Sequence, residues 1–232
     1  MRSPSKSRGI HVVIDGPDGV GITTQCNLLA TYLRTRGIPC AQTAEPSEGP
    51  VGQMLRRMLL HKEPALPPAA MQMAYVADRI SHGSLVVEPA LARGEVVVQA
   101  RGEWSTVVYN AARGVTEGER DNLARTAFGW HEEIEIPTLT ILLVAELGVT
   151  EARRTARGGE VELFDASDFQ ARVISLYEDA YNLVQLDWSM RYERAARNAL
   201  VVIDADAKVL EVHERVLAAI LAAGIIHESG TP

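Results

Sequence analysis

The sequence predicts an α/β fold in which a doubly wound, parallel, five-stranded sheet carries helices on both faces. Three observations support this prediction. Five short and almost entirely apolar runs occur along the chain, as is typical of strands that are buried on both faces of a sheet. Segments with apolar residues at helical spacing separate these runs, and a glycine-rich turn follows the first of them. Because strand and helix alternate, we expect right-handed crossovers and a ligand site at the carboxyl ends of the strands.

The strands are predicted from apolar runs that end in turn residues. GIHVVID leads into the glycine-rich turn, and CAQTA leads into the turn EPSEGP. EVVVQA, TLTILLVAE and ALVVIDA are equally apolar and follow helical stretches. In chain order, the predicted strands are 9–15, 40–44, 95–100, 138–146 and 199–205.

Helices are predicted where apolar residues recur every three or four positions. The first helix ends at Gly37 and Pro39, which do not continue a helix. The last helix is strongly amphipathic, as expected of a helix that packs one face on a sheet. In chain order, the predicted helices are 23–36, 51–60, 69–93, a stretch from about Ser105, and 209–223.

Length and composition favour one domain. A chain of 232 residues that is 47% hydrophobic can bury a substantial core, which we expect over 10–224, between a flexible tail at 1–9 and a C-terminal tail at 225–232. The net charge of −7 and the scattered basic residues argue against nucleic-acid binding. No apolar run approaches the ~20 residues of a membrane helix. Cys26 and Cys40 are too few for a disulfide framework, which favours a reducing cytoplasm.

The stretch HVVIDGPDGVGITTQ fits a phosphate-binding loop at every position but one, because Ile22 stands where the pattern has lysine. Such a loop points backbone N–H groups inward and adds the positive end of a helix dipole. Loss of the lysine removes a phosphate-neutralising charge, typically at a cost of about 100- to 1,000-fold in rate. The bare pattern also fits a turn that binds nothing. The candidate nucleotide-binding residues are Gly16, Asp18, Gly19, Gly21, Thr23 and Thr24, with the Thr23 hydroxyl as the candidate Mg²⁺ ligand.

Five further blocks follow the loop in an order and spacing that resemble the thymidylate kinase family. They are EPSEGPVGQMLRRMLL, MAYVADRISH, EPALARGEVVVQAR, STVVYNAARG and LVVIDADAKVLEVHERVLAAI. The resemblance covers nearly the whole chain and implies the P-loop nucleotide-kinase fold. It also implies a pyrimidine mononucleotide such as dTMP as ligand, ATP and Mg²⁺ as the cofactors of an active enzyme, and a homodimer.

The same resemblance implies roles for individual residues. Tyr75 stands where the family has an aromatic ring that stacks on the pyrimidine. Arg79 matches an arginine that faces the base and phosphate of the acceptor, and Arg101 offers a planar fork to a phosphate. Taken alone, Tyr75 also fits a core position, and Arg79 fits a surface pair with Asp78. The candidate substrate-binding residues are Glu45, Pro46, Tyr75, Arg79, Arg101, Ser105, Tyr109 and Asn110, with Asn110 where glutamine is usual.

The chain departs from the family on the phosphate and metal side. Besides Ile22, it has Ala100 and Val144 where the family has acidic residues. The segment TEARRTARGGEVELF falls where the family has a mobile lid, at about 150–168. A lid arginine could replace the lost lysine, although a solvated basic helix end fits the same residues. The candidate catalytic residues are Arg101, Arg153 and Arg157, and Arg154 belongs to the same basic group.

Three functions fit these observations. The first is a thymidylate-kinase-like protein that keeps a mononucleotide pocket but transfers phosphate from ATP poorly or in a redirected way. The second is an active kinase for dTMP or a modified pyrimidine nucleotide that uses lid arginines. The third is a non-catalytic, dimeric regulatory module. The candidate acceptor residues favour the first two over the third.

Overall fold

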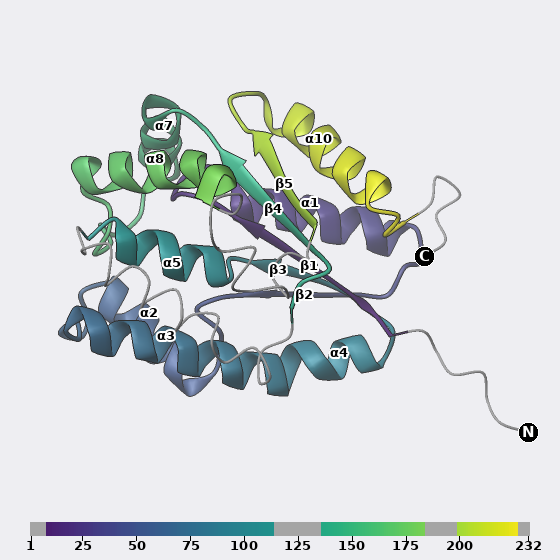
Figure 1. Cartoon of the computed structure of the whole chain (residues 1–232), viewed down its shortest axis with the longest axis horizontal. Coiled ribbons are helices and arrows are strands. Elements are labelled where there is room, and N and C mark those ends of the chain that lie inside the picture. The colour runs from purple at the N-terminus through teal and green to yellow at the C-terminus, as the bar shows by residue number, and fades with distance from the viewer. Residues whose placement is uncertain (1–7, 114–135, 184–198, 227–232) are drawn as a thin grey trace, which may run out of the picture.

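The computed structural model describes residues 8–113, 136–183 and 199–226, without the side chains of 180–183. A five-stranded parallel sheet in the order β2-β3-β1-β4-β5 forms its centre (Figure 1). The predicted fold class and all five predicted strands are confirmed. The strands are β1 (Ile10–Asp15), β2 (Cys40–Ala44), β3 (Val96–Ala100), β4 (Leu139–Val144) and β5 (Ala199–Asp204).

The strand order places the ligand site. β1 lies at the centre of the sheet, where Val12 pairs with Val98 of β3 on one side and with Leu139 of β4 on the other. From β1 the chain moves to one side for β2 and β3, and then to the other side for β4 and β5. The carboxyl ends of β1 and β3 therefore lie at the switch point where parallel α/β sheets bind ligands.

Two helices cover one face of the sheet, namely α1 (Ile22–Thr35) and α10 (Val209–Ala222) (Figure 1). Their apolar faces pack on alternate strand residues such as Val12, which is fully buried. The same core cluster includes Ile225 and Ile226. The core therefore extends two residues past the C-terminal boundary that the sequence suggested.

The opposite face is covered by α4 (Glu88–Ala92), α5 (Glu103–Ala111) and α8 (Ser167–Leu183). α4 packs on β3 through Leu91 and Val97, whereas α5 and α8 pack together on β4. α5 and α8 carry Ser105 and Tyr177, which bind Asp15 at the carboxyl end of β1. The packing of these two helices on the sheet therefore helps to position the ligand site.

The predicted helix over 69–93 is divided in the structure. α3 (Pro68–His82) packs against α2 (Pro50–Leu59), and a single π-helical turn, η1 (Gly83–Val87), separates α3 from α4. Pro89 has no N–H to donate four residues back, so the regular α-helical bonding is interrupted there. The helical direction is nevertheless continuous, as the prediction implied (Figure 1).

α7 (Leu147–Arg157) follows β4, and the connection 158–166 leads from α7 into α8. The expected tails lie largely outside the described residues, since 1–7 and 227–232 are not described. Within the described ranges, no helix combines the length and apolarity that a bilayer crossing requires.

Candidate nucleotide-binding site

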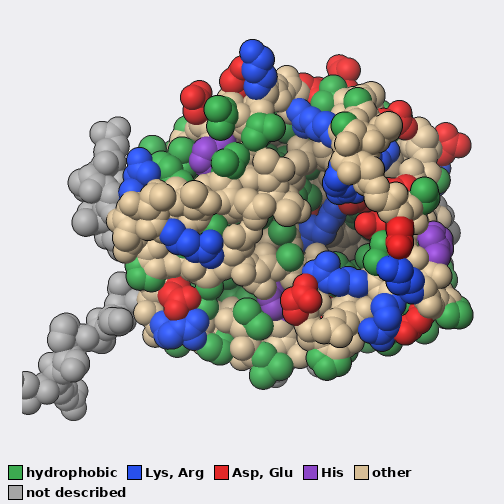
Figure 2. Space-filling model, turned by 180° about the vertical axis from the view of Figure 1, so that it is seen from behind, with side chains coloured by type: hydrophobic (Ala, Val, Ile, Leu, Met, Phe, Trp, Pro, Cys, Tyr) green, Lys and Arg blue, Asp and Glu red, His purple; other side chains and the backbone are tan. Residues whose placement is uncertain are grey.

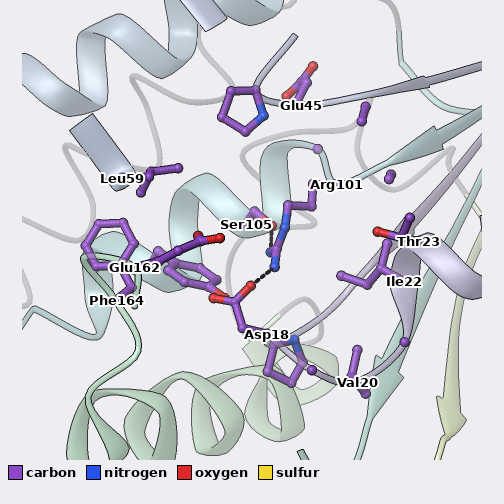
Figure 3. A pocket seen from close by; sticks show the side chains of 18 of the residues that line it. Asp18, Val20, Ile22, Thr23, Glu45, Leu59, Arg101, Ser105, Glu162 and Phe164 are labelled. Atoms are coloured by element: carbon purple, nitrogen blue, oxygen red, sulfur yellow. Dashed lines mark hydrogen bonds and ion pairs between the residues drawn. The ribbon is translucent and has the colours of Figure 1, made fainter. Parts of the chain in front are cut away.

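A cavity of about 790 Å³ opens at the carboxyl ends of β1 and β3, bounded by the loop after β1, the turn after β2, α3, α5 and the segment after α7 (Figure 3). Figure 2 shows the hollow, with Lys and Arg side chains gathered around it. Gly16 is the one predicted site residue outside its lining. The predicted residues that line it are Asp18, Gly19, Gly21, Thr23, Thr24, Glu45, Pro46, Tyr75, Arg79, Arg101, Ser105, Tyr109, Asn110, Arg153 and Arg157.

The glycines of the loop after β1 are required by its backbone. Gly16, Gly19 and Gly21 have φ values of +154°, +85° and +110°, which side chains disfavour. A Cβ on Gly16 would lie 2.4 Å from the Leu143 carbonyl oxygen, and one on Gly19 would lie 2.5 Å from that of Thr150. Gly21 is the N-cap of α1 and has no side chain to cap its first turn. The amides of that turn are therefore available to an anion.

Asp15, the last residue of β1, joins this loop to the start of α5. It is fully buried and accepts hydrogen bonds from the backbone N–H groups of Gly16 at 2.8 Å, Gly102 at 3.0 Å and Ser105 at 3.0 Å. The hydroxyl groups of Ser105 at 2.5 Å and Tyr177 at 2.9 Å also donate to it. Five donors to one carboxylate hold the loop and α5 in a single arrangement.

Arg101 reaches from the end of β3 into the loop. Its backbone N–H donates to the Ile14 carbonyl, and its guanidinium donates to the Gly16 carbonyl oxygen at 3.1 Å and to Ser105 Oγ at 2.9 Å. The guanidinium also pairs with the Asp18 carboxylate, as the dashed line in Figure 3 marks. A cation therefore lies against the phosphate loop although position 22 does not provide one.

Two of the three departures predicted on the phosphate side lie in the cavity. Ile22 lines it from the first turn of α1, and its side chain is 7% exposed because it also packs into the core. Ala100 lines the cavity from the end of β3. Neither residue can carry charge, so the phosphate side of the cavity depends on backbone amides and on arginines.

The prediction that position 144 belongs to the metal side is wrong. Val144 ends β4 and packs, half-buried, against the cluster that contains Trp104 and Tyr177. It does not line the cavity, and neither does Glu146. The reason is the alternation of side chains along β4, which turns Val144 towards α5 and α8.

Arg79 lies at the opposite side of the cavity, on α3. Its Nε donates to Glu45 Oε2 at 2.9 Å and its Nη2 donates to Thr106 Oγ1 at 2.7 Å. The remaining nitrogen, Nη1, is buried and has no hydrogen-bond partner among the described residues. The side chain is about 5% exposed, so this unpaired donor is costly unless a ligand atom accepts from it. Asp78 binds Ser47 instead, which excludes the surface pair.

Glu45 lines the cavity but is almost fully buried, and its carboxylate is held by protein groups. Arg79 binds Oε2, whereas His82 Nδ1 at 3.4 Å and Gln99 Nε2 at 3.2 Å lie near Oε1. Burial alone would raise the pKa of Glu45, but the charge of Arg79 and the hydrogen bonds outweigh it, and the pKa is lowered. Glu45 is therefore ionised at neutral pH and fixes the orientation of Arg79.

Tyr75 and Asn110 line the same half of the cavity. Tyr75 is half-buried and packs against a cluster of α2 and α3 residues, and burial raises its pKa to about 12. The Tyr75 side chain thus stays neutral. The amide nitrogen of Asn110 donates to the Thr106 carbonyl at 2.6 Å and also contacts Gln72. Asn110 is therefore anchored within α5 and α3.

Ser105 and Tyr109, both predicted as substrate-binding residues, are hydrogen-bonded to the loop side of the cavity. Ser105 binds Asp15 and Arg101, and the Tyr109 hydroxyl donates to Asp18 Oδ2 at 2.8 Å. The Tyr109 ring meets the Phe164 ring edge-on, with centroids 5.6 Å apart. Both residues thus tie α5 to the loop while they line the cavity.

The three arginines of α7 have different environments. Arg153 donates hydrogen bonds to the carbonyl oxygens of Val20, Ala205 and Ala207, so its hydrogen bonds with described residues are all to the main chain. Arg154 donates to the Asp18 carbonyl oxygen at 3.1 Å and does not line the cavity. Arg157 is exposed, lines the cavity and forms no hydrogen bond or salt bridge with any described residue.

Sequence reasoning missed several residues of this site. Asp15 could have been found as an acidic residue that ends an apolar strand directly before the glycine-rich loop. Gln99 is a polar residue in an otherwise apolar strand, which is a weaker signal. Glu162 and Phe164 line the cavity from an irregular segment, where no periodicity points to them.

Comparisons with known proteins agree with this geometry. The sequence profile described as thymidylate kinase matches residues 14–216. The thymidylate kinase of Thermomicrobium roseum is 37% identical over 210 residues, which cover 88% of this chain and 96% of that protein. That of Leifsonia xyli is 36% identical over 180 residues, which cover 76% and 84%.

The fold comparison extends the match to a solved structure. The thymidylate kinase of Candida albicans superposes with a TM-score of 0.72 at 20% identity, over 94% of this chain and 93% of that one. At this identity the superposition supports the fold alone, whereas the profile and the bacterial relatives carry the family assignment. This chain belongs to the thymidylate kinase family of P-loop nucleotide kinases.

Proposed function

We propose that this protein transfers a phosphoryl group from ATP to dTMP. One observation carries the proposal: a single cavity holds a phosphate loop with open amides at one side and a buried arginine with an unpaired Nη1 at the other. The cavity is large enough for a nucleotide pocket. The relatives named thymidylate kinase support dTMP as the acceptor.

Each half of the cavity has residues that fit its ligand. Arg79 lines the acceptor half with an unpaired Nη1, which suits an acceptor atom of the mononucleotide, and Glu45 fixes the orientation of its guanidinium. Tyr75 presents its ring to the base. At the other half, the loop amides hold the phosphates of the donor, while Arg101 and the exposed Arg157 offset charge as the phosphoryl group moves.

Mg²⁺ fits this site with few protein ligands. Among the described residues no group of three His, Cys, Asp or Glu side chains could hold a metal ion. Mg²⁺ is usually held by water and phosphate oxygens and needs only one or two ligands from the protein. The Thr23 hydroxyl can serve as such a protein ligand. When bound, the ion neutralises phosphate charge.

A second candidate is a nucleotide-binding protein that transfers phosphate weakly. It is favoured by Ile22 and Ala100, two uncharged residues at cavity positions where charge would help transfer. The family assignment and the positions of Arg101 and Arg157 support the active kinase better. The two candidates differ only in rate, so a turnover measurement separates them.

We also propose a homodimer, which the family resemblance implies. α3 and η1 expose large apolar side chains at Met73, Leu85 and Val86, with exposed fractions of 50%, 72% and 42%. Exposed apolar side chains on two consecutive helical segments are suited to pairing with a second copy. Light scattering at micromolar concentration that gave only a monomer would exclude this pairing.

The test of function is dTDP formation from dTMP, ATP and Mg²⁺, followed by chromatography. We expect turnover at ordinary kinase rates of ~1–100 per second. Thermal shift with each nucleotide alone gives a second readout, since a ligand at ~100 times its Kd adds about 2.7 kcal/mol to stability. Stabilisation by both nucleotides without dTDP formation would reject the active kinase and favour the protein that binds nucleotides but transfers phosphate weakly.

A further inference from the structure

α7 packs directly on the outer side of the phosphate loop. A Cβ on Gly19 would lie 2.5 Å from the Thr150 carbonyl oxygen and 2.8 Å from Cγ of Arg154, so the two backbones are in close contact. Thr150 itself is fully buried at this contact. The loop is therefore supported at Gly19 by one helical turn of α7.

Arginines bind the main-chain carbonyls of the loop at alternate positions. Arg101 donates to Gly16, Arg154 to Asp18 and Arg153 to Val20, each at 3.1 Å. Since these carbonyls are engaged by guanidinium groups, the loop cannot rotate its peptide units without breaking charge-assisted hydrogen bonds. The conformation that offers amides to phosphate is thus held by side chains from two other segments.

Arg154 differs from the other two because it does not line the cavity. Its side chain is only 11% exposed, and a single salt bridge is found for it within the described part of the chain, to Glu151 Oε1 at 4.0 Å from Nη2. Asp18, whose carbonyl it binds, is held at its carboxylate by Arg101, Tyr109 and Gln170. Arg154 therefore completes the restraint of Asp18 through its main-chain carbonyl, from outside the cavity lining.

We propose that Arg154 is a positioning residue for the donor phosphates, acting through the Asp18 carbonyl. This inference rests on the proposed function in that the loop is taken to bind the phosphates of a nucleoside triphosphate. The aim of the loop amides matters in this chain because Ile22 supplies no cation, so phosphate binding relies on those amides together with the cavity arginines. Loss of the Arg154 hydrogen bond should loosen the loop without touching the acceptor half.

The test compares Arg154→Met, which keeps an apolar stem beside Gly19, with Arg154→Lys, which keeps the charge. Titration calorimetry should show ATP–Mg²⁺ bound at least ~10-fold more weakly by Arg154→Met, as expected for one charge-assisted hydrogen bond. The affinity for dTMP should stay within ~2-fold. Arg154→Lys should recover only part of the ATP affinity, since an ammonium lacks the fixed fork of a guanidinium.

A matched control is Arg172→Met on α8, since Arg172 also donates to a main-chain carbonyl, that of Ala112 at 2.8 Å, and lies outside the cavity lining. It should leave both affinities unchanged. Hydrogen exchange of the ligand-free protein supplies a readout independent of nucleotide and activity: amides 16–24 should exchange ~10-fold faster in Arg154→Met and not in Arg172→Met.

The possible outcomes decide between roles. Unchanged ATP affinity and loop exchange in Arg154→Met would overturn the proposal, and so would an equal loss of ATP and dTMP affinity, which indicates a general folding role. Recovery of the ATP affinity by lysine without recovery of loop exchange would assign the effect to charge alone and also overturn it. Absence of dTDP formation by the unmodified protein, with ATP bound and loop exchange sensitive to Arg154, would reject the proposed function but keep the positioning role.

Discussion

Gln99 holds Arg101 in the backbone conformation that aims its guanidinium at the phosphate loop. Gln99 Nε2 donates to the Arg101 carbonyl oxygen at 2.8 Å, and Arg101 has φ of +66°, in the left-handed region. That region costs a non-glycine residue about 1–2 kcal/mol, so neighbouring contacts must maintain it. The same Nε2 lies 3.2 Å from Glu45 Oε1, so one side chain links the acceptor half of the site to the phosphate half.

Gln99→Met should therefore impair both halves. It removes both donated hydrogen bonds while keeping the side-chain volume, and we expect turnover to fall at least ~10-fold and unfolding stability to fall by about 1–3 kcal/mol. Urea denaturation and steady-state kinetics measure the two effects. Gln53→Met is the control, since Gln53 is exposed and its side chain donates to the carbonyl of Glu48, with no other partner among the described residues. Unchanged turnover in Gln99→Met would show that other contacts suffice to hold Arg101.

Arg79→Met should abolish mononucleotide binding and destabilise the protein. It leaves Glu45 as a buried carboxylate without its main partner, which typically costs about 3–5 kcal/mol. We expect dTMP affinity to fall more than ~100-fold, and Arg79→Lys to recover stability better than affinity. Arg93→Met, in the exposed pair with Glu95, should change neither. Calorimetry that found dTMP bound normally by Arg79→Met would exclude Arg79 from the acceptor site.

Ile22→Lys should raise turnover little by itself. A lysine there would meet phosphates without an acidic residue at position 100 to organise the transfer. We expect Ile22→Lys with Ala100→Asp to exceed the product of the two single effects, because catalytic groups that act together are non-additive. Val144→Asp should add nothing to turnover, since Val144 packs away from the cavity. Strictly multiplicative effects in the coupled enzyme assay would contradict this account.

Arg157→Ala should lower kcat while dTMP affinity stays unchanged. Arg157 is the α7 arginine that both lines the cavity and lacks a hydrogen-bond or salt-bridge partner among the described residues, so it is free to meet phosphates. Removal of one such charge typically costs about 100- to 1,000-fold in kcat. The control is Arg57→Ala, which breaks a surface pair with Glu63 at 2.6 Å. A normal kcat in Arg157→Ala would assign the neutralising charge to other cavity arginines such as Arg101 and Arg153.

Stability should fall as the pH drops below about 6.5. Burial lowers the pKa of His11 from 6.5 to about 4, so the unfolded chain takes up a proton that the folded chain refuses. The loss grows between pH 6.5 and 4 to on the order of 3 kcal/mol. Glu45, with its lowered pKa, adds a further loss only below about pH 4.5.

Urea denaturation of His11→Leu at a series of pH values from 7 to 5 tests whether His11 causes the loss of stability on acidification. The slope of stability against pH should flatten in that window, because a leucine takes up no proton. His61→Asn, at an exposed position, should leave the slope as it is. An unchanged slope in His11→Leu would assign the acid sensitivity to other groups.

The order of strands and helices was predictable from the sequence because those signals are local. An apolar run of five or six residues, a helical period and a glycine-rich turn are each recognisable within a short window of chain. All five strands were predicted correctly from such signals. The phosphate loop and the Arg79 and Arg101 positions were found in the same way, from motifs of fixed spacing.

Tertiary packing decided what those residues contact. Asp15 collects five donors from segments up to 162 positions away, and Arg153 and Arg154 turned out to bind loop carbonyls, which no spacing rule predicts. Val144 was misassigned for the same reason, since the face a strand residue occupies depends on what packs against the sheet. Long-range hydrogen bonds and the direction of side chains at a sheet edge arise only when distant segments meet.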